Sequence, residues 1–90
     1  MESIAGRFAW NEDDGLSKDL GPAKIFKDGS SYIGQYNKRG HRSGRGIYIF
    51  SSGMKYEGYW KHNKRHGKGR LIFTNGGYYT GNWVRDKRKG

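Results

Sequence analysis

Glycine and aromatic residues recur together along this 90-residue chain, with a period of 24 and then 23 residues. The recurring unit is a glycine, an aromatic residue three positions later, and then a second glycine and a second aromatic residue at alternate positions. It occurs as Gly29, Tyr32, Gly34 and Tyr36, as Gly53, Tyr56, Gly58 and Trp60, and as Gly76, Tyr79, Gly81 and Trp83. A chain that repeats at so short an interval folds as an array of similar units, each packed on its neighbours.

Two segments of each repeat alternate with period two, which is typical of β-strands. In the second repeat Tyr56, Gly58 and Trp60 share one face of the first segment, and alternate residues of the second segment, Gly67, Gly69, Leu71 and Phe73, also share one face. The pairs Asp28-Gly29 and Asn75-Gly76 favour tight hairpin turns between repeats, while a longer polar connection is expected inside each repeat. We predict an all-β fold, a single-layer twisted antiparallel meander of hairpins, elongated, with strands near 32–37, 46–50, 55–61, 69–73 and 78–84.

The glycines on the aromatic face have a structural explanation. Glycine weakens a strand unless a large ring on a neighbouring strand covers its backbone. We therefore predict that rings cover five structural glycines: Gly34, Gly58, Gly67, Gly69 and Gly81.

Composition excludes several classes of protein. With 32% hydrophobic residues, ninety residues cannot bury a large two-layer core, and the absence of cysteine excludes disulfides and thiolate metal sites. The sequence contains no signal peptide and no apolar run long enough to span a membrane, so a cytoplasmic location is expected. No arrangement of nucleophile and base, carboxylate pair, metal ligands or phosphate loop can be assembled, so we expect no catalysis, metal or cofactor.

Charge is distributed unevenly. Residues 1–28 carry a net charge of −2 and residues 29–90 carry +12. The bases cluster at the expected connection inside each repeat, and we predict that these basic loops line one long edge of the sheet and bind acidic partners. The predicted partner-binding bases are Lys38, Arg39, Arg42 and Arg45, then Lys61, Lys64, Arg65 and Lys68, then Arg85, Lys87, Arg88 and Lys89.

The segment GMKYEGYWKHNKRHGKGRLIF, residues 53–73, resembles the MORN (membrane occupation and recognition nexus) repeat. The resemblance covers residues 29–90 and divides them into repeats 29–52 and 53–75 and a half repeat 76–90. A degenerate strand at 22–28 extends the predicted sheet domain to 21–90. Residues 1–20 lack the pattern and are interpreted as a cap, a tail or a partner-binding arm anchored by Phe8 and Trp10.

The resemblance implies a non-catalytic scaffold or adaptor, in a cytoskeletal or ciliary assembly. Peripheral binding to anionic phospholipids through the basic loops is the first alternative, and a targeting fragment of a larger enzyme is the second. Nucleic acid is the least favoured partner, because the rings are committed to the sheet. The aromatic and edge contacts expected to serve a protein partner are Phe8, Trp10, Tyr32, Tyr36, Tyr56, Trp60, Tyr79 and Trp83.

The last predicted strand raises a further expectation. The sequence ends at Gly90, where a following strand would begin by analogy with the preceding repeat, so residues 78–84 are expected to lack a pairing strand on one side. An open strand edge invites another strand. We therefore expect a homodimer or strand addition by a partner at 78–84.

Overall fold

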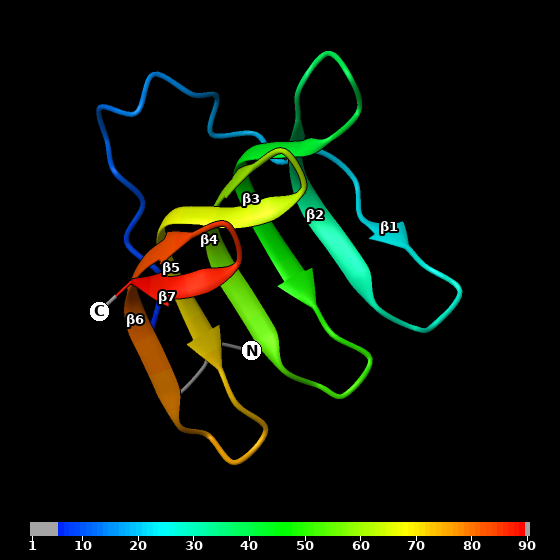
Figure 1. Ribbon diagram of the computed structural model, residues 1–90. Coiled ribbons are helices and arrows are strands. Elements are labelled where there is room, and N and C mark those ends of the chain that lie inside the picture. Colours follow the sequence, from blue (N-terminus) through cyan, green and yellow to red (C-terminus); the bar gives the residue numbers. More distant parts are fainter. Residues whose placement is uncertain (1–5, 90) are drawn as a thin grey trace.

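The computed structural model describes residues 6–89, of which residues 24–89 form one open antiparallel sheet of seven strands (Figure 1). Each strand pairs with its neighbours in sequence, so the order across the sheet is β1 to β7. The prediction of a single-layer meander is confirmed. The strands are β1 (Lys24–Ile25), β2 (Ser31–Tyr36), β3 (Arg42–Ile49), β4 (Lys55–Lys61), β5 (Lys64–Ile72), β6 (Tyr78–Val84) and β7 (Lys87–Lys89).

Three similar turns join β1 to β2, β3 to β4 and β5 to β6. In the first, the Gly29 N–H donates to the Phe26 carbonyl (3.1 Å) and the Phe26 N–H donates to the Ser30 carbonyl (2.8 Å). Gly29 has a φ of 89°, which suits the left-handed last position of a three-residue hairpin loop. The predicted turns between repeats are therefore confirmed.

The turns inside the repeats are shorter than predicted. The turn from β4 to β5 is only His62 and Asn63, at φ 50° and 68°, and that from β6 to β7 is only Arg85 and Asp86, at φ 49° and 70°. Positive φ at both positions gives a tight hairpin, and Asn and Asp tolerate it better than most residues. The expectation of a longer connection was wrong in these two places.

The connection from β2 to β3 keeps a longer loop, residues 37–41, which contains the extra residue of the 24-residue repeat. The Asn37 side chain holds this loop by accepting hydrogen bonds from the N–H groups of Arg39 (2.9 Å) and His41 (3.0 Å). The insertion therefore lies outside the strands.

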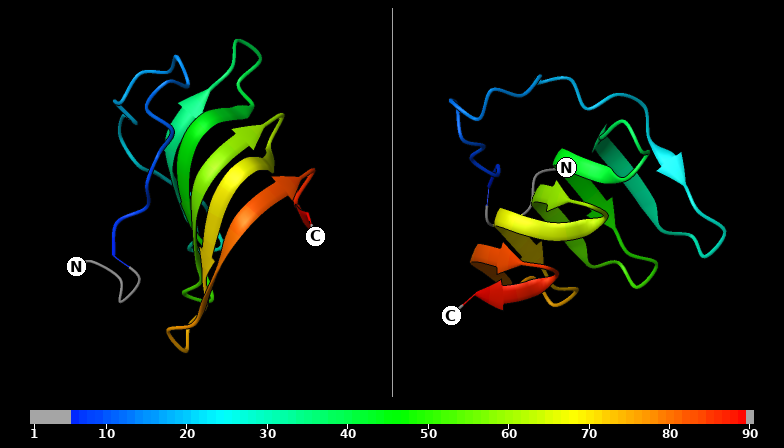
Figure 2. Two further views of the ribbon diagram at one scale, coloured as in Figure 1. Left: turned by 90° about the vertical axis from the view of Figure 1, so that its left-hand side faces the viewer. Right: turned by 45° about the horizontal axis from the view of Figure 1, so that its top comes forward.

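Two irregularities in strand pairing bend the sheet. The register shifts between Gly34 and Tyr36 and again between Gly58 and Trp60, and the strands paired there contain Gly44 (φ 95°) and Gly67 (φ 97°). An extra residue of this kind kinks its strand. In Figure 2 the hairpin ends curl toward one side of the sheet, which is therefore concave on that side.

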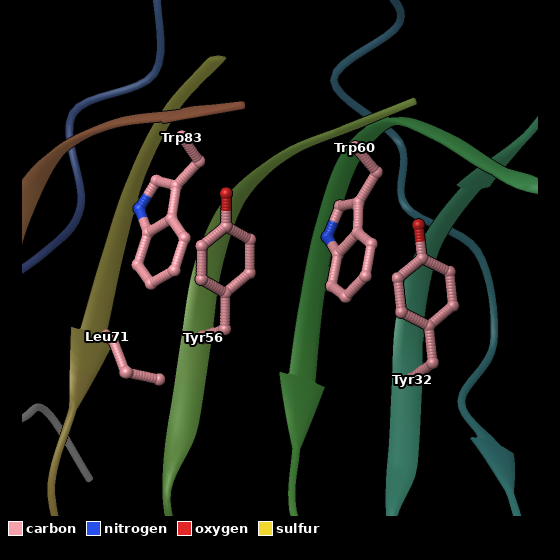
Figure 3. Close-up of a cluster of buried hydrophobic side chains, with 5 residues drawn as sticks. All are labelled: Tyr32, Tyr56, Trp60, Leu71 and Trp83. Atoms are coloured by element: carbon pink, nitrogen blue, oxygen red, sulfur yellow. The ribbon is translucent and has the colours of Figure 1, made fainter. Parts of the chain in front are cut away.

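The concave side carries a continuous row of aromatic rings, called here the aromatic face (Figure 3). Neighbouring rings meet edge to face with centroids 5.2–5.7 Å apart, an arrangement favoured by their charge distribution. The hydroxyls of Tyr32 and Tyr56, both fully buried, donate to the carbonyls of Gln35 and Tyr59, each at 2.9 Å. In order, the row is Tyr36, Tyr32, Trp60, Tyr56, Trp83 and Tyr79.

Tyrosine rings lie directly over the strand glycines. A Cβ added to Gly58 would lie 2.6 Å from the Tyr56 hydroxyl and 2.5 Å from the Gly69 Cα, closer than real side chains approach. Tyr32 covers Gly34, Tyr56 also covers Gly69, and Tyr79 covers Gly81. The expectation of a ring from a neighbouring strand holds for Gly69 only, because Gly34, Gly58 and Gly81 lie under the tyrosine two residues earlier in their own strand.

Gly67 was assigned wrongly to this group. Its left-handed φ places it in the β5 irregularity, and a Cβ there would meet the Tyr59 Cβ at 3.3 Å, not a ring of the aromatic row. Glycine is therefore needed at position 67 because the backbone there is left-handed, and not because a ring covers it.

The end of the sheet also differs from the prediction. β7 pairs with residues 82–84 of β6, so the expectation that 78–84 has no following strand is wrong for that half. The reason is the two-residue turn at Arg85 and Asp86, which leaves enough chain for a short return strand. Within the described residues, Tyr78–Gly81 has no pairing strand on that side. Residues 1–5 of the predicted arm and Gly90 of the half repeat lie outside the described residues.

Candidate functional site

The N-terminal arm crosses the convex side of the sheet, opposite the aromatic face (Figure 2). Its described part, residues 6–20, forms neither strand nor helix. It lies against side chains of β2, β3, β4 and β5 that alternate with the aromatic row, since Tyr59 lies between Gly58 and Trp60 in β4. We call this convex surface the arm face.

Two aromatic residues anchor the arm. Phe8 is buried, and its ring meets Trp10 edge to face at 4.8 Å, while Trp10 meets Tyr59 in the same way at 5.5 Å. The Lys68 ammonium lies 5.4 Å from the Phe8 ring and the Arg45 guanidinium 5.3 Å from the Trp10 ring, distances typical of cation–π attraction. The structure thus brings together four residues named from sequence, Phe8, Trp10, Arg45 and Lys68.

Asp14 is the polar anchor of the arm. Its carboxylate accepts a hydrogen bond from Arg45 Nε at 2.8 Å and another from the Tyr59 hydroxyl. The Arg45 hydrogen bond, and after it the Tyr59 hydrogen bond, lower the pKa of Asp14 from its ordinary 3.8 to about 2. The Tyr59 hydroxyl in turn accepts the Asn11 N–H at 2.8 Å, and burial followed by the Asp14 contact raises the pKa of Tyr59. Docking of the arm therefore favours the ionised form of Asp14.

Most other polar contacts use the main chain of the arm. Lys68 Nζ donates to the Ala9 carbonyl (2.8 Å), Arg70 Nη2 to the Gly6 carbonyl (2.6 Å), Arg45 Nη2 to the Asn11 carbonyl (3.1 Å) and Gln35 Nε2 to the Ser17 carbonyl (2.6 Å). The sheet supplies the donors and the arm supplies acceptors that every residue type has.

Arg70 is positioned by a buried partner within the sheet. Its Nη2 also donates to Glu57 Oε1 at 3.3 Å, and both side chains are almost fully covered. Pairing with Glu57 lowers the cost of burying the Arg70 charge beneath the arm. Arg70 is therefore a cationic group of the arm face that a residue of the sheet itself helps to position.

The predicted basic residues are distributed differently from the expectation. Only Lys38, Arg39 and Arg85 lie in turns, and the other nine belong to strands β3, β4, β5 and β7. They do not line a single edge, because alternation along the strands sends Arg45 and Lys68 to the arm face and Arg42, Arg65 and Arg88 over the aromatic face.

One basic cluster does form at the curled end of the sheet, between neighbouring hairpins. A pocket of about 360 Å³ there is lined by Lys61, His62, Lys64, His66 and Arg85. This hairpin-end pocket is suited to an anionic group, because its lining includes three permanent positive charges.

Three arginines that were predicted only as partner-binding bases occupy equivalent positions of the repeats and lie over the aromatic face. Arg42, Arg65 and Arg88 lie 23 residues apart, and each guanidinium lies over a ring, at 4.9 Å from Trp60, 4.5 Å from Trp83 and 4.6 Å from Tyr79 respectively. The repeat alignment contained this signal.

The predicted aromatic contacts prove to be mostly internal. Tyr32, Tyr56, Trp60 and Trp83 are the buried core of the sheet, whereas Tyr36 remains 46% exposed. Of the arm-face residues, Asp14, Gln35, Glu57, Tyr59 and Arg70 were not predicted. Tyr59 could have been found, because it is an aromatic residue at a position where the other repeats have Gln35 and Asn82.

Residues 6–89 contain no group of three or more His, Asp and Glu side chains placed to hold a metal ion. In the same residues no helix is long and apolar enough to cross a membrane.

Comparison with models of protein families identifies the repeats and their bounds. The MORN repeat model matches residues 32–55, 56–78 and 79–90, so the matched units begin at Tyr32, Tyr56 and Tyr79, the tyrosines that cover the strand glycines. MORN repeats are non-catalytic modules, and no enzyme domain was found in the chain. No curated protein matches it. With most of its length matched and a meander built on the repeated tyrosines and glycines, the chain belongs to the MORN repeat family.

Proposed function

We propose that this chain is a non-catalytic protein-interaction module that acts as a small scaffold or adaptor. The observation that supports it is the extended segment held on the arm face, where side chains of several strands bind main-chain carbonyls, two aromatic rings and a carboxylate. Such groups also recognise extended segments of other proteins.

A cytoskeletal or ciliary assembly within the cytoplasm is the setting that the family resemblance favours. The net charge of +10 supports a partner with an acidic surface, such as those common on cytoskeletal proteins. Strand addition remains part of the proposal at Tyr78–Gly81, the part of the β6 edge that β7 leaves uncovered.

Peripheral binding to anionic phospholipids is the second candidate, and the hairpin-end pocket is the observation that favours it. Positive side chains near a membrane surface each contribute about 1 kcal/mol of attraction to acidic lipids. A role as the targeting part of a larger enzyme is compatible with either partner.

One pair of matched variants tests these functions. Lys61→Ser with Lys64→Ser removes two exposed charges from the hairpin-end pocket, and Lys18→Ser with Lys27→Ser removes the same charge elsewhere on the surface. Arg65 and Lys68 are left unchanged, because both make contacts within the chain.

The binding assays compare protein with lipid. Proteins captured from the source cells are identified by mass spectrometry, purified and retested singly, beside sedimentation with phosphatidylserine vesicles. Direct binding of a purified protein supports the scaffold proposal. Binding to vesicles alone, lost in the pocket variant and kept in the control, would replace it with the lipid proposal.

A further inference from the structure

The arm is attached to the sheet without becoming part of it. Residues 6–23 form no strand, so the arm could leave the arm face without breaking any pairing between the seven strands. Several arm residues, among them Glu12 and Asp13, are exposed to solvent. A segment bound in this way is a ligand of the sheet that happens to be covalently linked to it.

The contacts divide into general and selective ones. Main-chain carbonyls of Gly6, Ala9 and Asn11 can be supplied by any extended segment. The selective groups are the rings of Phe8 and Trp10 and the carboxylate of Asp14. A competing segment would therefore need two aromatic residues at positions i and i+2 and an acid at i+6.

Charge complementarity favours the same type of ligand. The arm face presents Arg45, Lys68 and Arg70, and its buried acid, Glu57, is already paired with Arg70. The arm between residues 6 and 20 has four acids and two bases. Acidic aromatic segments are thus matched to this face by sign as well as by shape.

We propose that the arm face is a binding surface for an extended acidic aromatic segment of another protein, and that the arm occupies it until such a segment displaces the arm. The inference rests on the proposed scaffold function and names the chemistry of its partner. The arm then lowers the apparent affinity of the arm face for the partner segment, because a tethered competitor acts at a high effective concentration.

The short link between the arm and β1 favours a segment of another protein over the arm of a second copy as the competing ligand. Asp19 lies at Gln35 on β2, with its carbonyl 3.5 Å from Gln35 Nε2, and only residues 20–23 separate it from β1. Exchange of the whole arm, up to Asp19, with a second copy would require residues 20–23 alone to span the distance from β1 of one copy to β2 of the other. A segment of a separate protein has no such restriction.

The test uses the full chain and a synthetic peptide of residues 6–19 with a fluorescent label. The opened variant carries Phe8→Ser, Trp10→Ser and Asp14→Asn, and the matched control carries Glu12→Gln and Asp13→Asn, which alter acids outside the anchor contacts. Peptide binding is followed by fluorescence anisotropy. We expect the opened variant to bind at least about tenfold more tightly than the wild type or the control, because its own arm no longer competes. A peptide with Asp14→Asn should bind the opened variant more weakly.

Folding is checked by far-ultraviolet circular dichroism, and mass by light scattering. A folded opened variant that binds the peptide no better than the wild type would overturn the proposal. A wild-type dimer that is lost in the opened variant would also overturn it, in favour of arm exchange between copies.

A second measurement covers the case in which the opened variant does not fold. Excess unlabelled peptide is added to the ¹⁵N-labelled wild type, and the Trp10 indole resonance should move to its free position. An unchanged Trp10 resonance at saturating peptide would contradict displacement. Either negative result leaves the scaffold function intact if a purified protein still binds elsewhere, so the two failures can be told apart.

Discussion

Arg65 and Asp86 join consecutive hairpins at four points. The Arg65 N–H and Nε donate to Asp86 Oδ1 (2.7 and 3.3 Å), Arg65 Nη2 donates to the Asp86 carbonyl (3.1 Å), and the Asp86 N–H donates to the Arg65 carbonyl (2.9 Å). Arg42 and Asn63 form the same arrangement one repeat earlier, except that no Nε contact is found there. Each two-residue turn is thus fastened to the preceding repeat.

Replacing Asp86 should weaken this connection in a residue-specific way. Asp86→Gly keeps the positive φ and removes the acceptor, and we expect a loss of about 1 kcal/mol, or about 4–8 °C in thermal midpoint. Asp86→Asn should be close to neutral, since Asn63 already fills the equivalent position. Arg85→Gly in the same turn controls for added backbone freedom. Equal midpoints for Asp86→Gly and Arg85→Gly would contradict this account.

The packing of rings over glycines predicts a large effect at Gly58. In Gly58→Val the new side chain would collide with the Gly69 backbone as well as the Tyr56 hydroxyl, so the sheet cannot relax by moving a side chain alone. We expect a loss of about 1–3 kcal/mol, as for other overpacked sites. Lys64 is exposed, so Lys64→Ala should change the free energy of unfolding by less than about 0.5 kcal/mol. Thermal unfolding of both variants tests this, and equal midpoints would refute the packing explanation.

Acid should release the arm. The pKa of Asp14 is lowered from 3.8 to about 2 by Arg45 on β3 and Tyr59 on β4, so its contribution to docking is present above pH 3.8 and disappears as the pH falls toward 2. The Trp10 indole resonance, followed by NMR from pH 6 to pH 2, should report this transition. In Asp14→Asn the transition should be absent, which separates Asp14 from the other carboxylates. If the transition persists in that variant, a titrating group other than Asp14 releases the arm.

The uncovered part of β6 should cause self-association of the purified chain. Tyr78 is 54% exposed beside the unpaired stretch Tyr78–Gly81, and an open apolar edge attracts further strands. We expect the mass from light scattering to rise with concentration, and Tyr78→Lys to suppress the rise. A wild type that stays monomeric at all concentrations would rule out this edge as an association site.

The sequence was sufficient for the parts of the fold that repeat. Tyr56, Gly58 and Trp60 have equivalents in the other repeats. Their alternation predicts a strand with an aromatic face, and their repetition predicts that similar strands pack beside it. The sequence was misleading at the hairpin ends, because a run of polar and basic residues was interpreted as a loop. There the positive φ of Asn63 and the irregularity at Gly67 let both strands continue.

The arm contacts could be predicted only in part. The apolar character of Phe8 and Trp10 identified them as anchors, but nothing in their spacing indicates which surface they cover. Their partners Tyr59 and Arg70 are far away in the sequence, and the equivalent positions of the other repeats lack an aromatic or basic residue. Contacts of this kind follow from the assembled sheet rather than from local preference.

The course of the arm also bears on how the molecule folds and opens. The sheet is built from neighbouring hairpins, so its strands could form or fray one unit at a time, as in other linear arrays. The arm instead connects residues up to 64 positions apart, with Asp14 bound to Arg45 and Gly6 bound to Arg70. By fastening residues 6–19 across the central strands, it turns a row of semi-independent hairpins into a more cooperative unit, whose hydrogen exchange should slow across β3 to β5 together whenever the arm is bound to the arm face.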